Sequence, residues 1–152
     1  MQDLPHRYSV TAHVAPEGDA FLYAKQLPLL TSAPPTEFGG PGDRWSPETL
    51  LTAAVADCFV LTFRAIAAAT PLPWVDIKCE EGTLDRVDRV VRFTDMLLRA
   101  YLRIPHGASA DQAQRVLTRA KERCLVSNSL ISPSRLEVVV EVAADGEKAS
   151  AA

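Results

Sequence analysis

The sequence predicts an α+β fold in which two main helices, one of them long and central, pack on a mostly antiparallel sheet. Three observations predict it. Apolar and polar residues alternate with a period of two over 8–14, 75–104 and 135–142, as in half-buried strands. Helical patterns occupy 47–70 and 110–124. Turn sequences separate these segments, giving the order β-β-loop-α-β-β(-β)-α-β, which is typical of α+β domains.

Length and charge narrow the functional classes. The 152 residues predict a single domain, 1–152, with an ordered core at about 7–142 and a disordered tail at 144–152. The formal net charge is −3, and acidic and basic residues are interspersed. We therefore expect neither a nucleic acid nor a membrane as a partner.

The first third of the chain predicts a hairpin followed by a long loop. A strand at 8–14, turn residues at 16–19 and an apolar run at 20–25 form the expected hairpin. Prolines and glycines dominate the next segment, 27–45, which predicts irregular structure. Loops of this length in compact domains are usually functional or disordered.

The long helix has a clear start. Ser46 suits the N-cap and Pro47 the first helical position, and the pattern continues to about Thr70. Asp57 and Arg64 interrupt the apolar run, so we expect a central helix and not a membrane span. Apolar residues occupy nearly every face, which is more than one small sheet can cover, and this predicts a contribution from a partner subunit.

The second half predicts two or three strands at 75–104, a helix and a last strand at 135–142. A capping box, Ser109 to Gln112, opens the helix. Its apolar residues form one stripe with helical spacing, which ends at Cys124.

The chain has three cysteines, Cys58, Cys79 and Cys124. An odd number without a CxxC pair argues against a disulfide framework or a zinc site, and the scattered histidines argue against a metal cluster. The first residues lack the apolar stretch of a signal peptide, so we expect a cytoplasmic, thiol-reducing setting. Cys79 is interpreted as a small apolar residue on a strand. From their spacing alone, Cys58 and Cys124 are either two core thiols or a reactive pair.

Two motifs resemble the OsmC-like family of organic hydroperoxide reductases. A Pro-Glu pair, Pro47 and Glu48, opens the long helix, and Cys58 follows ten residues after the glutamate. A Cys-x-x-Ser-Asn motif begins at Cys124. The order of elements agrees with that family over roughly 7–142.

The resemblance implies an OsmC-like fold in an intertwined homodimer with two interfacial active sites, and a thiol peroxidase activity. Cys58 would reduce an organic hydroperoxide to the alcohol and become a sulfenic acid. Cys124 would then form a disulfide with it, which an external dithiol, typically a lipoylated protein, would reduce. Glu48 would orient a basic partner. No metal or flavin cofactor is implied.

Helix geometry adds an independent expectation. Ten helical residues rise about 15 Å, so Glu48 and Cys58 of one chain are too far apart to serve one site. If both act at the same site, they come from two chains, in agreement with the expected homodimer.

The mechanism requires a cation beside Cys58, because apolar surroundings disfavour the thiolate. The family supplies an arginine from the early loop, but Glu37 stands about where it is expected, so Arg44 is our candidate. Asp57 replaces a small residue, and Leu125 replaces a frequent proline. These differences leave two alternatives to a peroxidase: a protein that binds a small apolar ligand, or a redox sensor.

Overall fold

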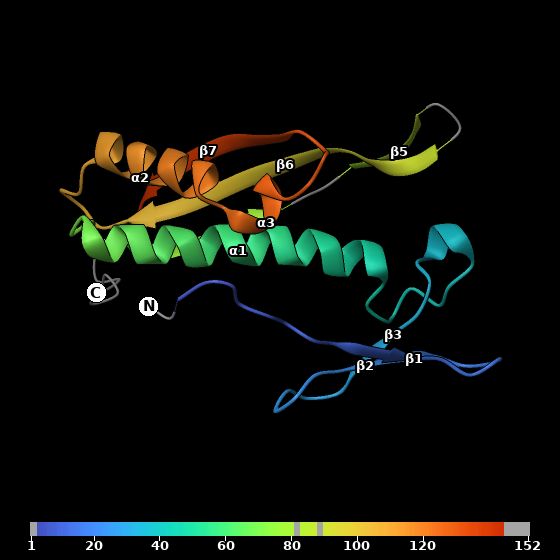
Figure 1. Cartoon of the computed structure of the whole chain (residues 1–152). Helices are drawn as coiled ribbons and strands as arrows, with labels where there is room; N and C mark the ends of the chain where they lie inside the picture. Colours follow the sequence, from blue (N-terminus) through green and yellow to red (C-terminus); the bar gives the residue numbers. More distant parts are fainter. Residues whose placement is uncertain (1–2, 81–82, 88–89, 145–152) are drawn as a thin grey trace. The chain divides into compact units, whose positions relative to one another are not determined.

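A computed structural model of the chain describes residues 3–80, 83–87 and 90–144 (Figure 1). The chain forms two compact units, 1–51 and 52–152, and each is described by itself. The expectation of one domain stays a prediction. Of the predicted disordered tail, Ala144 is exposed and the remainder, 145–152, lies outside the described residues.

The N-terminal unit contains a three-stranded antiparallel sheet in the order β1-β2-β3. Its strands are β1 (Thr11–His13), β2 (Ala20–Tyr23) and β3 (Leu30–Ser32). A short 3₁₀ helix, η1 (Thr36–Phe38), follows. The predicted β1–β2 hairpin is confirmed, with Thr11 opposite Tyr23.

Two expectations for this unit were wrong. The first strand covers only Thr11–His13 of the predicted 8–14, and all three residues are exposed, not half-buried. The predicted irregular segment also contains β3, in which Leu30 pairs with Leu22 of β2. Local alternation shows neither fact, because strand length and pairing depend on a distant partner.

Helix α1 (Pro47–Ala69) begins where the sequence predicts. The Thr49 N–H donates to Ser46 Oγ at 3.2 Å, so Ser46 caps the helix. One stripe of α1 is buried in the single chain: Val55, Phe59, Phe63, Ile66 and Ala67. Leu61, on another face, stays 43% exposed. The helix is therefore buried along one stripe, and its exposed face carries Asp57 and Arg64 on either side of Leu61.

Among the described residues, α1 is the one helix whose length and composition would allow it to span a membrane, with a mean hydropathy of 1.8 over its best window. The central helix of a globular protein satisfies the same criterion. Only 28% of that window is buried.

The second unit is built on a four-stranded sheet around β6 (Val90–Ile104) (Figure 1). Strands β4 (Asp76–Glu80) and β5 (Thr83–Val87) pair with β6 antiparallel, and β7 (Ser134–Val142) pairs with it in parallel. The prediction of a mostly antiparallel sheet is confirmed.

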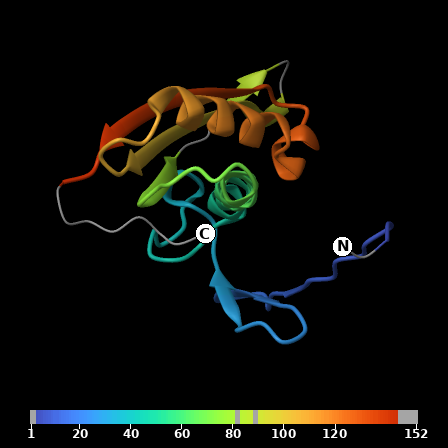
Figure 2. The same cartoon turned by 90° about the vertical axis from the view of Figure 1, so that its left-hand side faces the viewer.

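Helix α2 (Ala110–Glu122) covers the apolar face of this sheet (Figure 2). From Met96 onward, every second residue of β6 is buried there: Met96, Leu98, Ala100, Leu102 and Ile104. The predicted stripe of α2 is buried too: Ala113, Val116, Leu117 and Ala120. These two sets form the core of the unit.

Half of the predicted capping box is confirmed. The N–H of Gln112 donates to Ser109 Oγ at 3.2 Å. The Gln112 side chain makes a hydrogen bond outside the cap, in which its Nε2 donates to Thr70 O at 2.7 Å. It thereby links the start of α2 to the end of α1.

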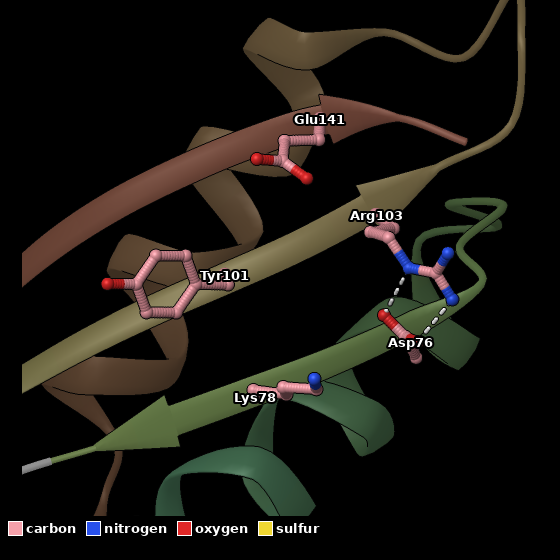
Figure 3. A pocket seen from close by; sticks show the side chains of 5 residues that line it. All are labelled: Asp76, Lys78, Tyr101, Arg103 and Glu141. Carbon is pink, nitrogen blue, oxygen red and sulfur yellow. Dashed lines mark hydrogen bonds and ion pairs between the residues drawn. The ribbon is translucent and has the colours of Figure 1, made fainter. Parts of the chain in front are cut away.

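The other face of the sheet is polar. Arg103 of β6 forms two hydrogen bonds with Asp76 of β4, beside Lys78, Tyr101 and Glu141 in a shallow pocket of about 290 Å³ (Figure 3). The hydrogen bond from Arg103 is the main reason that the pKa of Asp76 is lowered.

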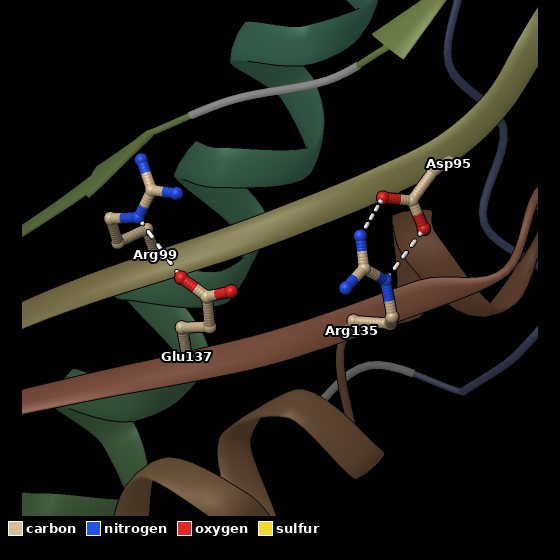
Figure 4. A network of polar contacts seen from close by, with 4 residues as sticks. All are labelled: Asp95, Arg99, Arg135 and Glu137. Atoms are coloured by element: carbon tan, nitrogen blue, oxygen red, sulfur yellow. Dashed lines mark hydrogen bonds and ion pairs between the residues drawn. The ribbon is translucent and has the colours of Figure 1, made fainter.

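Further along this face, β6 and β7 are joined by Arg135–Asp95 and Arg99–Glu137 (Figure 4). In each of these two pairs an arginine faces a carboxylate, so their charges balance.

Candidate functional site

Cys124 lies where the chain leaves α2 and begins a short helix, α3 (Leu125–Asn128), of which it is the N-cap. The prediction that Cys124 is buried is confirmed, because its exposure is 0%. Its thiol donates to the carbonyl oxygen of Val55 on α1, with Sγ and O 3.8 Å apart. This contact brings a residue near the C-terminus against the middle of the long helix.

Cys58 follows Val55 by three positions on α1, so the two residues lie on the same face of the helix. Burial of the Cys124 thiol raises its pKa most, and interaction with the nearby Cys58 raises it further. The structure therefore brings the two predicted cysteines together, 66 positions apart in the sequence.

The two thiols differ in access. Cys58 is half-buried and Cys124 is fully buried. A small molecule that enters from solvent therefore meets Cys58 first. Two neighbouring thiols of this kind can exchange two electrons by forming a disulfide.

Ser127 is a neighbour of this pair that the sequence analysis did not include among the site residues. Its side chain is 3% exposed, and its hydroxyl donates to the Cys124 backbone oxygen at 3.2 Å. Both its side chain and its backbone N–H lower the pKa of Cys124, against the larger effect of burial. Its position in the Cys-x-x-Ser-Asn motif was the available signal, but spacing alone does not distinguish it from a helix-ending residue.

Glu48 lies in the first turn of α1, about 15 Å along the axis from Cys58. Its Oε2 atom is buried, and the residue lines a cavity of about 440 Å³ in the N-terminal unit. The cavity walls are mainly apolar, with Phe38 and several prolines, and Glu17 adds a second carboxylate. The size falls in the range of small-molecule pockets.

Arg44 belongs to the same unit and is exposed. Its Nε donates to Asp19 Oδ2 at 3.0 Å, and its Nη1 lies 2.9 Å from Asp43 Oδ2. The hydrogen bond with Asp19 is the main reason that the pKa of Arg44 is raised. Arg44 is absent from the described lining of the cavity that holds Glu48. Its role as the cation beside Cys58 stays a prediction.

Cys79 is half-buried on β4, opposite Ala100 of β6, in agreement with a strand position. In the described part of the chain, no three His, Cys, Asp or Glu side chains gather in a way that could hold a metal ion.

Known proteins resemble this chain in sequence and in fold. The uncharacterized protein YmaD of Bacillus subtilis is 27% identical over 124 residues, which are 78% of this chain and 83% of YmaD. An OsmC-like protein of unknown function from Vibrio cholerae superposes with a TM-score of 0.79 at 15% identity, over 89% of this chain and all of that one. An organic hydroperoxide resistance protein OsmC from Legionella pneumophila superposes with a TM-score of 0.71 at 24% sequence identity, over 92% of this chain and all of that one.

The two solved structures show the shared fold, since their identities to this chain are low. The family model described as OsmC-like protein matches residues 40–147, which include α1, both helices that follow the long strand, and all three cysteines. The chain belongs to the OsmC-like protein family.

Proposed function

We propose that this protein is a thiol-dependent peroxidase that reduces organic hydroperoxides. The observation that carries the proposal is the position of Cys124: its Sγ lies 3.8 Å from Val55 O, one helical turn before Cys58 on α1, and Cys58 influences its pKa. Its relatives include proteins named for organic hydroperoxide resistance, which associates the family with peroxide chemistry.

The proposed cycle has three balanced steps. The Cys58 thiolate attacks the peroxide O–O bond, takes one oxygen to become a sulfenic acid and, with one proton, releases the alcohol. The Cys124 thiol then displaces the sulfenic oxygen as water and forms the Cys58–Cys124 disulfide. An external dithiol, such as a lipoylated protein, reduces the disulfide and becomes oxidised itself. No metal or flavin takes part.

Burial supports this order of events. Cys58 is half-buried and can meet a substrate, whereas Cys124 has no exposed surface. The raised pKa of Cys124 keeps this thiol protonated near neutral pH, so it is unsuited to the first attack.

We further propose that the active protein is a homodimer in a cytoplasmic, reducing setting. A second copy would cover apolar residues of α1 that the single chain leaves exposed, such as Leu61. It would also bring the partner's Glu48 to the cysteine pair, which the 15 Å rise forbids within one chain. Arg44 is the proposed cation. In this role it would have to break its ion pairs with Asp19 and Asp43 and move next to the Cys58 thiolate.

The test is the Cys58→Ser variant, with Cys79→Ser as the matched control on β4. We expect Cys58→Ser to abolish reduction of tert-butyl hydroperoxide by dihydrolipoamide, and Cys79→Ser to retain it. Mass spectrometry after one equivalent of peroxide should detect the Cys58–Cys124 disulfide in the control. Equal turnover by the two variants would contradict the proposal.

A second candidate function is the binding of a small apolar ligand without peroxide turnover. The apolar cavity of about 440 Å³ beside Glu48 favours it. It predicts that neutral apolar probes such as hexanol shift NMR signals of Phe38 and its neighbours. It also predicts that peroxide leaves the thiols of Cys58 and Cys124 unpaired, which separates the two functions.

A further inference from the structure

We infer that Ser127 is a positioning residue for the second sulfur: its hydroxyl turns from a backbone carbonyl to the Cys124 sulfur and stabilises the thiolate that closes the disulfide. This inference rests on the proposed function for its place in the cycle. Its physical basis is the pair of hydrogen bonds made by the Cys124 thiol and the Ser127 hydroxyl, which the structure shows and a sequence match does not.

The resting arrangement directs two protons toward backbone oxygens. The Cys124 thiol donates to Val55 O, and the Ser127 hydroxyl donates to Cys124 O. Both side chains are almost completely buried, at 0% and 3% exposure. Water is therefore a poor source of hydrogen bonds for either group.

Loss of the thiol proton changes the Cys124 sulfur from a hydrogen-bond donor to an acceptor. A thiol donates to Val55 O, but a thiolate only accepts, and next to that carbonyl it meets a negative dipole. The Ser127 hydroxyl is a rotor with one proton, and Ser127 already acts on the Cys124 thiol through its side chain and its N–H. Rotation of this hydroxyl replaces a weak neutral bond with a charge-assisted one.

The step that needs this donor is the second one. The Cys124 sulfur forms a bond to the Cys58 sulfur while the S–O bond of the sulfenic acid breaks, and the thiol proton leaves with the oxygen as water. Negative charge builds on the Cys124 sulfur as its proton departs. Ser127 stabilises that charge, whereas the attack of Cys58 on peroxide does not involve it.

Other charges around Cys124 do not replace this donor. Cys58 on α1 is the group whose charge acts on the Cys124 thiol among the described residues, and it raises the pKa. From α2, Lys121 offers its carbonyl oxygen to the Cys124 N–H at 3.3 Å. Glu122 and Arg123 are exposed. On the described surroundings, Ser127 is the group that favours the ionised sulfur.

The experiment compares Ser127→Ala with Ser129→Ala. Ser129 is the matched control because it is exposed in the same short segment, and its hydroxyl donates to Leu125 O at 2.8 Å. Reduced protein is mixed with one equivalent of cumene hydroperoxide from pH 6 to 10. Sulfenic acid trapped by dimedone reports the first step, and disulfide measured by mass spectrometry reports the second.

We expect Ser127→Ala to leave the first step unchanged and to slow the second about tenfold at pH 7, the effect of one hydrogen bond to a charged group. The pH profile of the second step should move up by about one unit. Ser127→Thr, which keeps the hydroxyl, should restore most of the rate, and Ser129→Ala should match the parent. An unchanged second step in Ser127→Ala would overturn the inference.

A second measurement is independent of peroxide turnover. In a Cys58→Ser, Cys79→Ser background, Cys124 is the remaining cysteine, and its ionisation is followed by thiolate absorbance at 240 nm. Adding Ser127→Ala should raise the ionisation pH by about one unit. If that substitution prevents folding, Ser127→Val and Ser127→Thr, which have nearly the same shape and differ in the hydroxyl, are compared in the same absorbance titration.

The two measurements separate the two ways to fail. Absence of any peroxide oxidation in the parent, together with the expected absorbance shift, would overturn the proposed function and retain the role of Ser127. Normal peroxide oxidation with no shift and no slowed second step would overturn the role of Ser127 alone.

Discussion

Closing the Cys58–Cys124 disulfide should stabilise the folded protein substantially. The two cysteines are 66 positions apart, and the bridge would join the middle of α1 to the turn between α2 and α3. A cross-link over a loop of this length lowers the entropy of the unfolded chain by an amount worth about 4 kcal/mol at 25 °C. This gain is realised in full only if the folded protein accepts the bond without distortion.

The assay is urea unfolding of the reduced protein and of protein oxidised by one equivalent of hydroperoxide, at equal protein concentration. With a urea m-value of about 2 kcal/mol/M, the oxidised midpoint should lie roughly 2 M higher. Equal concentration matters because a dimer makes the midpoint concentration-dependent. Mass spectrometry confirms that the bond is intramolecular, and Cys124→Ser, which cannot form it, should show no gain.

A lower midpoint for the oxidised protein would refute the reasoning. It would show that the two sulfurs reach each other only by straining α1 or the turn at Cys124. The contact to Val55 O and the interaction with Cys58 argue against such strain, because they already hold the sulfurs on neighbouring surfaces.

Three further predictions concern stability. Above the ordinary thiol pKa, the free energy of unfolding of the reduced protein should fall by up to about 1.4 kcal/mol per pH unit, because folded Cys124 keeps its proton at a pH where the unfolded chain releases it. Urea unfolding at a series of pH values measures this slope, and Cys124→Ala should remove it. Leu117→Ala should cost about 2–5 kcal/mol of unfolding free energy because Leu117 is fully buried, while Leu125→Ala, at 75% exposure, should change it by less than about 0.5. Gly40→Ala should disrupt the loop before α1, because the new Cβ would lie 1.6 Å from Pro34 O; an unchanged midpoint and circular dichroism spectrum would contradict this.

The sequence was sufficient wherever the signal is local. The start of α1 is recognisable because Ser46 caps its own helix, and the stripe of α2 because each turn repeats the same apolar spacing. The long strand β6 alternates from Met96 to its end for the same reason. These features depend on residues within one or two turns of each other, so periodicity is enough to find them.

The sequence was insufficient where a distant partner decides. The strand predicted at 8–14 shortened to three exposed residues, and β3 formed inside a segment that has the composition of a loop. The Gln112 side chain donates to Thr70 O, just beyond the C-terminal end of α1. Each outcome depends on which distant backbone groups the fold brings within hydrogen-bonding distance, and a local sequence pattern cannot predict those partners.

The candidate site divides in the same way. The two cysteine motifs and the family can be read from the sequence, since they are matters of residue type and spacing. Only the tertiary structure places Cys124 against Val55 and Cys58, removes it from water and sets Ser127 beside it. The reactivity of a thiol depends on its surroundings in space, and segments separated by 66 positions share surroundings only after the chain has folded.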